Sequence, residues 1–435
     1  MNLYILGGAS TVLSLLGIFL GARWVRLFAL LTVAAGLIVL ALTWGAHASA
    51  FGGLYRVDRV SQAITLVALL GVGWSLLLSR SERWEYPLLL LYTAFGIHVI
   101  ASTTNLVVLL VALELFSLPL YALATWRRDL TGYEAGLKYF LLGALAAAIF
   151  LYGIALHFGA TGSFDAQAAG TGPLYVASLF LILSALAFKV ALVPFQWWTP
   201  DVYQGSPTEI SLTMATAVKA AGFAALIRVL LPADLGGWGL GLGILIALSV
   251  IFGNLGALAQ KEAKRLLAYS SIAQAGYIAL ALYSPQGVPA LSFYLIAYLL
   301  ATGLAFAILS AISDREVPYE RLQGLLYRDP LMGLGFAAAM LSLTGIPPLV
   351  GFWAKYLVFV QAAQAGEYGL VVLALITSAV SAYYYLRLLG LVVFSSPPEG
   401  APQRLSPLAR GTVWLGLILL LLLGIAPGIG YALVG

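Results

Sequence analysis

Residues 105–126 read NLVVLLVALELFSLPLYALATW and contain one charged side chain, Glu114. Most of the other side chains in this stretch are apolar. An α-helix needs about 20 apolar residues to cross the roughly 30 Å of a bilayer's hydrocarbon core. The stretch therefore predicts a transmembrane helix that carries a carboxylate at membrane depth.

The whole chain has the composition of an integral membrane protein. Of its 435 residues, 62% are hydrophobic and 9% are charged, and the mean hydropathy is +0.99. Soluble domains carry about 25% charged residues. The backbone polar groups of a segment in lipid must be satisfied internally, and side chains that are apolar all round exclude the alternation of a β-barrel. We therefore predict an all-α integral membrane protein.

The apolar runs between polar breaks predict about 14 transmembrane helices. The longest run exceeds one crossing and contains Pro347 and Pro348, and the seventh run contains Pro194. Proline removes a backbone donor and clashes with the preceding turn, so we expect the seventh and twelfth helices to be broken. The approximate spans are 3–20, 27–44, 60–79, 86–103, 105–126, 136–158, 174–200, 208–231, 238–259, 266–283, 288–312, 330–364, 368–392 and 411–431.

The basic residues of the connecting loops predict the orientation. Even-numbered loops hold only Arg56, Arg59 and Arg228, whereas odd-numbered loops hold fifteen Lys and Arg residues. Cytoplasmic loops of membrane proteins are enriched in Lys and Arg. We therefore predict cytoplasmic odd loops and both termini on the outer side of the membrane, which in a bacterial inner membrane is the periplasmic side. The fifteen are Arg23, Arg26, Arg80, Arg83, Arg127, Arg128, Lys261, Lys264, Arg265, Arg315, Arg321, Arg328, Arg387, Arg404 and Arg410.

Several classes of chemistry are disfavoured. The chain has no cysteine, and its three histidines, His47, His98 and His157, lack metal-ligand spacing. Disulfides, thiolate metal sites and iron–sulfur ligation are therefore excluded. The formal net charge of +5 is spread over short loops, so we interpret it as membrane orientation and predict no nucleic-acid partner.

Four charged side chains lie deep within the apolar runs, away from their ends: Glu114, Lys189, Lys219 and Lys355. A charge at the bilayer centre costs at least ~2.5–3.5 kcal/mol on insertion scales, and such residues usually mark ion or proton pathways. Desolvation makes a lysine ammonium release its proton more easily, whereas arginine stays charged. We predict that these four side chains transfer protons.

A purely structural pair is the alternative, since intramembrane polar pairs contribute only about 0.6 kcal/mol on average. Lys189 and Lys355, however, each lie beside a proline break. Paired broken helices point to a transport site near the bilayer midplane. Two accessory candidates can also have a purely structural role. Lys138 can extend to the cytoplasmic surface, and Lys264 can be a cytoplasmic anchor, although it could also open a route for protons.

Several stretches resemble the antiporter-like subunits of respiratory complex I. ELFSLPLYAL, from Glu114, resembles their fifth helix, and FKVALVPFQWWTPDVYQGSPTEI, from Phe188, their broken seventh helix. KRLLAYSSIAQAGY from Lys264 and TGIPPLVGFWAKYLV from Thr344 resemble the tenth and twelfth helices. KYFLLG and LYGIALHFGATGS, at 138–143 and 151–163, point to the N subunit of NADH–quinone oxidoreductase.

The resemblance implies fourteen helices with two inverted five-helix repeats. The corresponding division is 1–85 for helices 1–3, 86–231 for the first repeat, 238–392 for the second and 409–435 for helix 14. It further implies that Glu114 pairs with Lys189, that Lys219 is the central lysine of the eighth helix and that Lys355 passes the proton onward.

Two positions depart from the family pattern. Many relatives have histidine where this chain has Gln196 and Gln274. Glutamine does not take up and release a proton near neutral pH, although it can orient a water molecule. Any histidine-mediated step is therefore in doubt, and both glutamines are accessory site candidates.

The resemblance implies a proton-translocating membrane-arm subunit without a redox centre. FMN, iron–sulfur clusters and quinone are expected in other subunits, and this chain is expected to bind no cofactor and no metal. Its expected partners are subunits K and M and the lipid bilayer. A Na⁺/H⁺ antiporter subunit and a structural scaffold remain the alternatives.

Overall fold

The computed structural model describes residues 1–231, 238–397 and 406–435. Arg404, one of the basic residues of the predicted odd loops, lies outside them. Within the described ranges the chain is helical, apart from one hairpin of strands β1 (Ala48–Ala50) and β2 (Tyr55–Val57). The strands are antiparallel with Ala48 opposite Val57. The predicted all-α membrane class is confirmed in this outline.

The chain divides into two compact units. The first comprises residues 1–190 and 217–231 of the described chain, and the second comprises 191–216 and the described residues from 238 onward. The predicted four-part division stays a prediction.

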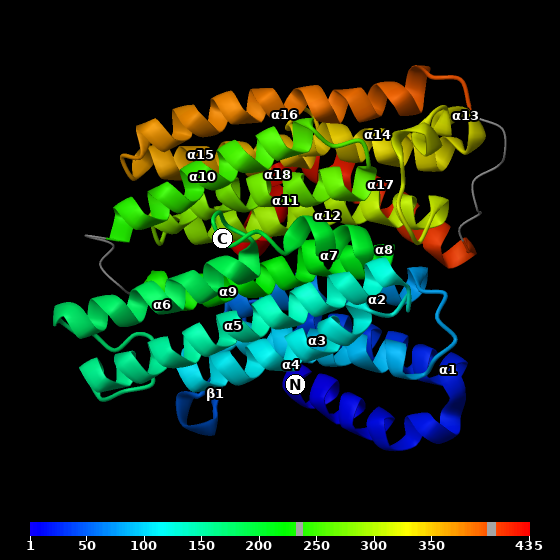
Figure 1. Cartoon of the computed structure of the whole chain (residues 1–435). Coiled ribbons are helices and arrows are strands. Elements are labelled where there is room, and N and C mark those ends of the chain that lie inside the picture. Colours follow the sequence, from blue (N-terminus) through cyan, green and yellow to red (C-terminus); the bar gives the residue numbers. More distant parts are fainter. Residues whose placement is uncertain (232–237, 398–405) are drawn as a thin grey trace. The chain divides into compact units, whose positions relative to one another are not determined.

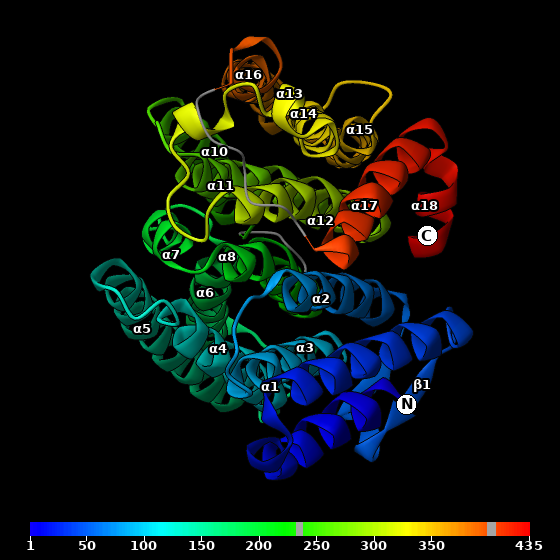
Figure 2. The same cartoon turned by 90° about the vertical axis from the view of Figure 1, so that its right-hand side faces the viewer.

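The first unit is a bundle in which α3 packs against α1, α2 and α4, and α5 packs against α4 and α6. Figure 1 and Figure 2 show α2, α3 and α4 side by side. Its helices are α1 (Asn2–Leu42), α2 (Arg59–Leu78), α3 (Glu85–Ala101), α4 (Leu106–Ala124), α5 (Leu130–Thr161), α6 (Gly172–Val190) and α9 (Lys219–Leu230).

The second unit is built around α12 (Gly287–Ile312), which is buried over 94% of its most apolar stretch. Helices α8, α11, α14, α15 and α17 all pack against it. The remaining elements are α7 (Thr199–Gly205), α8 (Thr208–Thr213), α10 (Trp238–Leu258), α11 (Ala263–Ala279), η3 (Leu280–Tyr283), η4 (Tyr319–Leu322), α13 (Leu325–Arg328), α14 (Pro330–Thr344), α15 (Val350–Gln364), α16 (Tyr368–Phe394), α17 (Pro407–Ile425) and α18 (Pro427–Val434).

Eleven of the described helices are long and apolar enough to cross a membrane, and α3 and α14 are shorter apolar helices. Each predicted apolar run overlaps one or more of the described helices. The number of candidate spans is lower than the fourteen predicted helices partly because α1 contains the first two runs. It bends at Gly21, whose φ of 70° and ψ of 161° are non-helical. The fourteen crossings and the inverted repeats stay predictions.

Two helices end inside the membrane-spanning runs, where the prolines predict breaks. Helix α6 ends at Val190, earlier than the predicted 200, because Ala191 adopts a left-handed φ of 64° before Pro194. Helix α14 ends at Thr344, followed by Gly345 with a φ of 91° and by the proline pair. The last carbonyls of a helix have no intrahelical donor. Each break therefore leaves backbone acceptors that need a partner.

A half-buried ion pair ties together three helices of the first unit. Asp58 caps α2 by accepting a 2.8 Å hydrogen bond from the Ser61 N–H. It also accepts two hydrogen bonds from Arg228 of α9, at 2.6 and 2.8 Å, and Arg228 donates to the Ala101 carbonyl at the end of α3. Burial disfavours the charged form of Asp58, but Arg228 and the Ser61 N–H outweigh it and lower the pKa of Asp58.

Asp58→Asn is expected to lower the free energy of unfolding by about 2 kcal/mol, the contribution of a hydrogen bond to a charged group. Thermal unfolding of the detergent-solubilised protein measures it. Glu134→Gln, which breaks the exposed ion pair with Lys138, is the control and should change the free energy by at most about 0.5 kcal/mol.

The same variant predicts a pH dependence. Because the pKa of Asp58 is lowered in the folded protein, its contribution to stability is complete at pH values above the ordinary aspartate pKa of about 4. It is lost as the pH falls through the lowered folded value. A difference between wild type and Asp58→Asn that does not shrink in acid would contradict this assignment.

Candidate functional site

Lys189 lies in the last turn of α6 and is 2% exposed. Its Nζ donates hydrogen bonds to the Ser117 Oγ at 2.9 Å and to the Tyr121 hydroxyl at 3.4 Å, both on α4. The Nζ also lies 5.8 Å from the ring centre of Phe116 and 5.7 Å from that of Tyr121. Aromatic faces attract a cation within about 6 Å. Helix α4 therefore provides an ammonium site that contains no carboxylate in direct contact.

Glu114 lies on α4, one turn before Ser117, and is half-buried. It attracts Lys189 electrostatically. The two side chains form no direct ion pair, because the Lys189 Nζ is directed at Ser117 and Tyr121. Within the described residues one Glu114 carboxylate oxygen is buried without a hydrogen-bond partner.

Lys219 begins α9 and is 2% exposed. Its Nζ donates a 2.8 Å hydrogen bond to the carbonyl of Val190, the last residue of α6. A helix C-terminus carries unsatisfied carbonyls and a partial negative charge, so a cation is stabilised there. Lys219 thus caps the broken α6, whose last turn carries Lys189, and both lysines lie in the first unit with Glu114.

Lys355 of α15 repeats this arrangement in the second unit. Its side chain is 6% exposed, and its Nζ donates a 2.9 Å hydrogen bond to the carbonyl of Thr344, the last residue of α14. It also donates to the Ser378 Oγ at 2.8 Å and lies 5.2 Å from the ring centre of Tyr277. Each unit therefore contains a buried lysine on the last carbonyl of a helix that is broken before a proline.

Lys264, in the first turn of α11, is fully buried rather than placed at the surface. Its Nζ donates to the carbonyls of Ser206 at 2.7 Å and Gln204 at 3.1 Å, at the end of α7. It is a third lysine on a helix C-terminus. This contact accounts for its burial as a structural cap, and its role as a proton carrier stays a prediction.

Lys138 and Gln196 do not join these contacts. Lys138 forms an i, i+4 ion pair with Glu134, with side chains 40% and 60% exposed. Gln196 lies between α6 and α7, and its Oε1 is buried without a hydrogen-bond partner within the described chain.

Gln274 of α11 is held in a buried hydrogen-bond network. Its Nε2 donates to the Leu343 carbonyl at 3.3 Å and to the Tyr385 hydroxyl at 3.2 Å, and its Oε1 accepts from the Tyr294 hydroxyl. Both amide donors are in use. These hydrogen bonds therefore fix the orientation of the amide. A glutamine amide does not take up a proton near neutral pH, so it cannot itself carry one.

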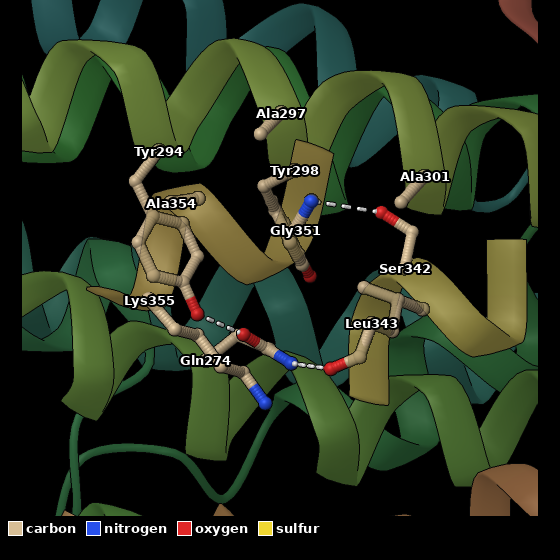
Figure 3. Close-up of a pocket in the computed structure, with 10 residues that line it drawn as sticks. All are labelled: Gln274, Tyr294, Ala297, Tyr298, Ala301, Ser342, Leu343, Gly351, Ala354 and Lys355. Carbon is tan, nitrogen blue, oxygen red and sulfur yellow. Dashed lines mark hydrogen bonds between the residues drawn. The ribbon is translucent and has the colours of Figure 1, made fainter. Parts of the chain in front are cut away.

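A small cavity lies beside Gln274 (Figure 3), with about 10 Å³ open to the centre of a water molecule. Figure 3 shows the Tyr298 hydroxyl pointing into the space enclosed by the lining residues. Within the described chain this hydroxyl completes no hydrogen bond, although the Ser271 and Thr302 hydroxyls lie near it. The polar residues that line the cavity are Gln274, Tyr294, Tyr298, Ser342 and Lys355.

The cavity fits one water molecule. A water needs roughly 10–15 Å³ of such volume and two to four polar partners. An ammonium has three donors, and Thr344 and Ser378 take two of those on Lys355. Lys355 and Tyr298 both line the cavity, and the Tyr298 hydroxyl points into it.

Sequence reasoning missed the hydroxyl partners of the lysines. Ser117 and Tyr121 follow Glu114 by three and seven residues, which places all three near one face of the helix, so this spacing was a usable signal. Tyr298 gave no signal, because it is one of 23 tyrosines and its burial depends on packing. Among the described residues no group of three His, Asp or Glu side chains is arranged to hold a metal ion.

Comparison with known proteins decides the family. A model of the family described as "NADH:quinone oxidoreductase/Mrp antiporter, TM" matches residues 103–381, more than half of the chain. NADH-quinone oxidoreductase subunit 14 of Thermus thermophilus is 59% identical over 429 residues, which cover 99% of this chain and 98% of that protein. This chain belongs to the NADH:quinone oxidoreductase/Mrp antiporter family.

Other members of the family agree. NADH-quinone oxidoreductase subunit N of Deinococcus radiodurans is 39% identical over 410 residues, which cover 88% of this chain and 83% of that one. A chain of respiratory complex I from Thermus thermophilus with bound aureothin is 58% identical, with a TM-score of 0.94 over 99% of both chains. The resemblance to the N subunit is confirmed.

The Lys355 cap predicts different effects for two glycines that share a φ of 91°, Gly345 and Gly366. Alanine at either position is strained by the left-handed backbone and should cost about 1 kcal/mol or more. A Cβ on Gly345 would lie 3.1 Å from the Lys355 Cδ, whereas one on Gly366 would meet nothing within 4 Å. We expect a larger drop in melting temperature for Gly345→Ala. Equal drops would contradict the packing of Lys355 against the break.

Proposed function

We propose that this chain is a proton-translocating membrane-arm subunit of an NADH:quinone oxidoreductase. Glu114, Lys189 and Lys219 would transfer protons in the first unit, and Lys355 in the second. The family match and the 59% identical relative support the assignment to such a complex. The transfer roles are supported by the burial of the three lysines.

One observation carries the proposal: Lys219 and Lys355 each cap the last carbonyl of a helix that ends before a proline inside a predicted apolar run. Neutral oxygens stabilise an ammonium without neutralising it. Lysine in such a place can hold or release a proton, whereas arginine would stay charged. Loss of the proton removes the charge that the helix C-terminus stabilises. Protonation is therefore coupled to the local structure of the break.

The Glu114–Lys189 pair supplies a means of control. Lys189 now binds neutral hydroxyls while Glu114 attracts it from a distance. A shift toward direct contact would favour the protonated lysine, and a shift away would favour transfer to the neighbouring Lys219. Moving one elementary charge through 100 mV requires about 2.3 kcal/mol, comparable with one hydrogen bond to a charged group. No large rearrangement is required.

In this proposal the driving energy comes from redox chemistry elsewhere in the complex. FMN, iron–sulfur clusters and quinone would belong to other subunits, with subunits K and M as neighbours of this chain. Protons would be taken up on the side of the odd loops and would leave through Lys355. Both termini would then lie on the periplasmic side of the inner membrane.

Gln274 determines the local route to Lys355. Because its amide is fixed by its hydrogen bonds, the proton must pass beside it. The cavity with room for one water, which Tyr298 and Lys355 both line, offers that passage. In this proposal Tyr298 therefore transfers the proton. Many relatives have a histidine at position 274 that could take this role.

The primary test is Lys219→Ala in the complex reconstituted in vesicles, with protons counted per electron. We expect coupled proton transfer to slow by on the order of a hundredfold, the usual contribution of a positioned acid or base. Lys261→Ala removes an exposed loop lysine and serves as the control. Glu114→Gln should also reduce the number of protons moved per electron.

Proton pumping that is unchanged in Lys219→Ala and in Glu114→Gln would reject the assigned roles. Retained pumping after substitution of Lys189, Lys219 and Lys355 together would favour a scaffold. Sodium-dependent proton exchange by the wild-type complex would favour the antiporter alternative.

Tyr298→Phe tests the passage beside Gln274. We expect fewer protons per electron, and we expect Gln274→His in the same chain to restore part of the loss with a new pH dependence near the ordinary histidine value of about 6.5. Tyr384→Phe removes a buried hydroxyl that binds Asn254 and does not line the cavity, so it should pump normally. Unchanged pumping in Tyr298→Phe, or a loss that Gln274→His does not repair, would contradict the route.

A further inference from the structure

A basic pocket lies at the bend of α1, away from the lysine sites. Arg23 and Arg26 follow the non-helical Gly21, and residues 80–82 follow α2. Together they enclose about 530 Å³, within the range of roughly 300–1,000 Å³ for small-molecule sites. We call this the elbow pocket, defined by Arg23, Arg26, Arg80, Ser81 and Glu82.

The charge of the elbow pocket favours an anion. Three arginines line it, together with one acidic residue, Glu82. Arg26 is anchored by a hydrogen bond to the Ser81 carbonyl. The Arg23 guanidinium pairs with no carboxylate in the part of the chain that the structure describes. Planar guanidinium groups bind phosphate through paired N–H donors, so the pocket has the chemistry of a phosphate site.

The surface beside the pocket distinguishes a lipid from a free phosphate. Leu15, Ile18 and Phe19 share one face of the first limb of α1 and are 68%, 68% and 84% exposed. Trp24 lines the pocket and is 58% exposed. Tryptophan is enriched at the level of the lipid headgroups. An apolar face that leads to a basic pocket matches acyl chains below a phosphate headgroup.

We propose that the elbow pocket binds the headgroup of an anionic phospholipid, with its acyl chains along the exposed face of α1. Arg23 and Arg80 contact the phosphate, and Arg26 is held in place by Ser81. Basic pockets between transmembrane helices are known to bind anionic lipid headgroups. A zwitterionic lipid binds less well, because its own cation competes with the arginines.

The test measures lipid retained by the purified complex. The complex is equilibrated in mild detergent with phosphatidylglycerol or phosphatidylcholine, and bound lipid is counted by mass spectrometry. We expect Arg23→Gln with Arg80→Gln to weaken phosphatidylglycerol binding about fivefold per removed charge, equivalent to about 1 kcal/mol each. Arg83→Gln is the control, because Arg83 pairs with Glu85 and lies over the Trp126 ring outside the pocket.

Both substituted arginines are exposed, so the double variant should fold, and Arg23→Lys with Arg80→Lys should retain part of the binding because the charge remains. Equal phosphatidylglycerol binding by wild type and the double Gln variant would overturn the proposal. Equally tight phosphatidylcholine binding would overturn the anionic preference. Displacement of the lipid by millimolar inorganic phosphate would identify a free-anion site and overturn the lipid assignment.

Discussion

A helix that ends inside a buried apolar run leaves backbone carbonyls without an intrahelical donor, and the described site depends on how this chain satisfies them. At Val190 and at Thr344 the acceptor is met by the ammonium of a buried lysine. A backbone group left unsatisfied in lipid costs several kcal/mol, and an unpaired ammonium there is also costly. The ammonium donates to the carbonyl, so each of these two polar groups satisfies the other. The break and the lysine are therefore one structural feature.

This arrangement explains why the charges are lysines with few direct acidic partners. Lys355 is held by a carbonyl, a hydroxyl and an aromatic face, and Lys189 by hydroxyls and aromatic rings. A direct carboxylate would stabilise the ammonium more strongly and hinder release of the proton. Neutral acceptors hold the ammonium in place and still allow it to lose its proton. Glu114 attracts Lys189 electrostatically without being one of the groups that contact its ammonium.

The sequence was most informative where one residue type has one physical consequence. Long apolar runs predicted helices, prolines predicted the ends of α6 and α14, and isolated charges predicted buried side chains. Contacts that depend on packing were not predictable. The sequence suggested that Lys264 is a cytoplasmic anchor, but the residue is buried and donates a hydrogen bond at the end of α7. Arg228 and Asp58, 170 residues apart, meet only because α9 returns to α2. The water-sized cavity at Tyr298 depends on four helices whose mutual packing no local pattern encodes.

The most direct test of this account is a density map of the assembled complex that resolves ordered water. The account predicts a water molecule within hydrogen-bond distance of both the Lys355 Nζ and the Tyr298 hydroxyl, and lysine ammonium groups on the carbonyls of Val190 and Thr344. Dry, tightly packed side chains between Lys355 and Tyr298, with the lysines turned away from both broken helices, would contradict it.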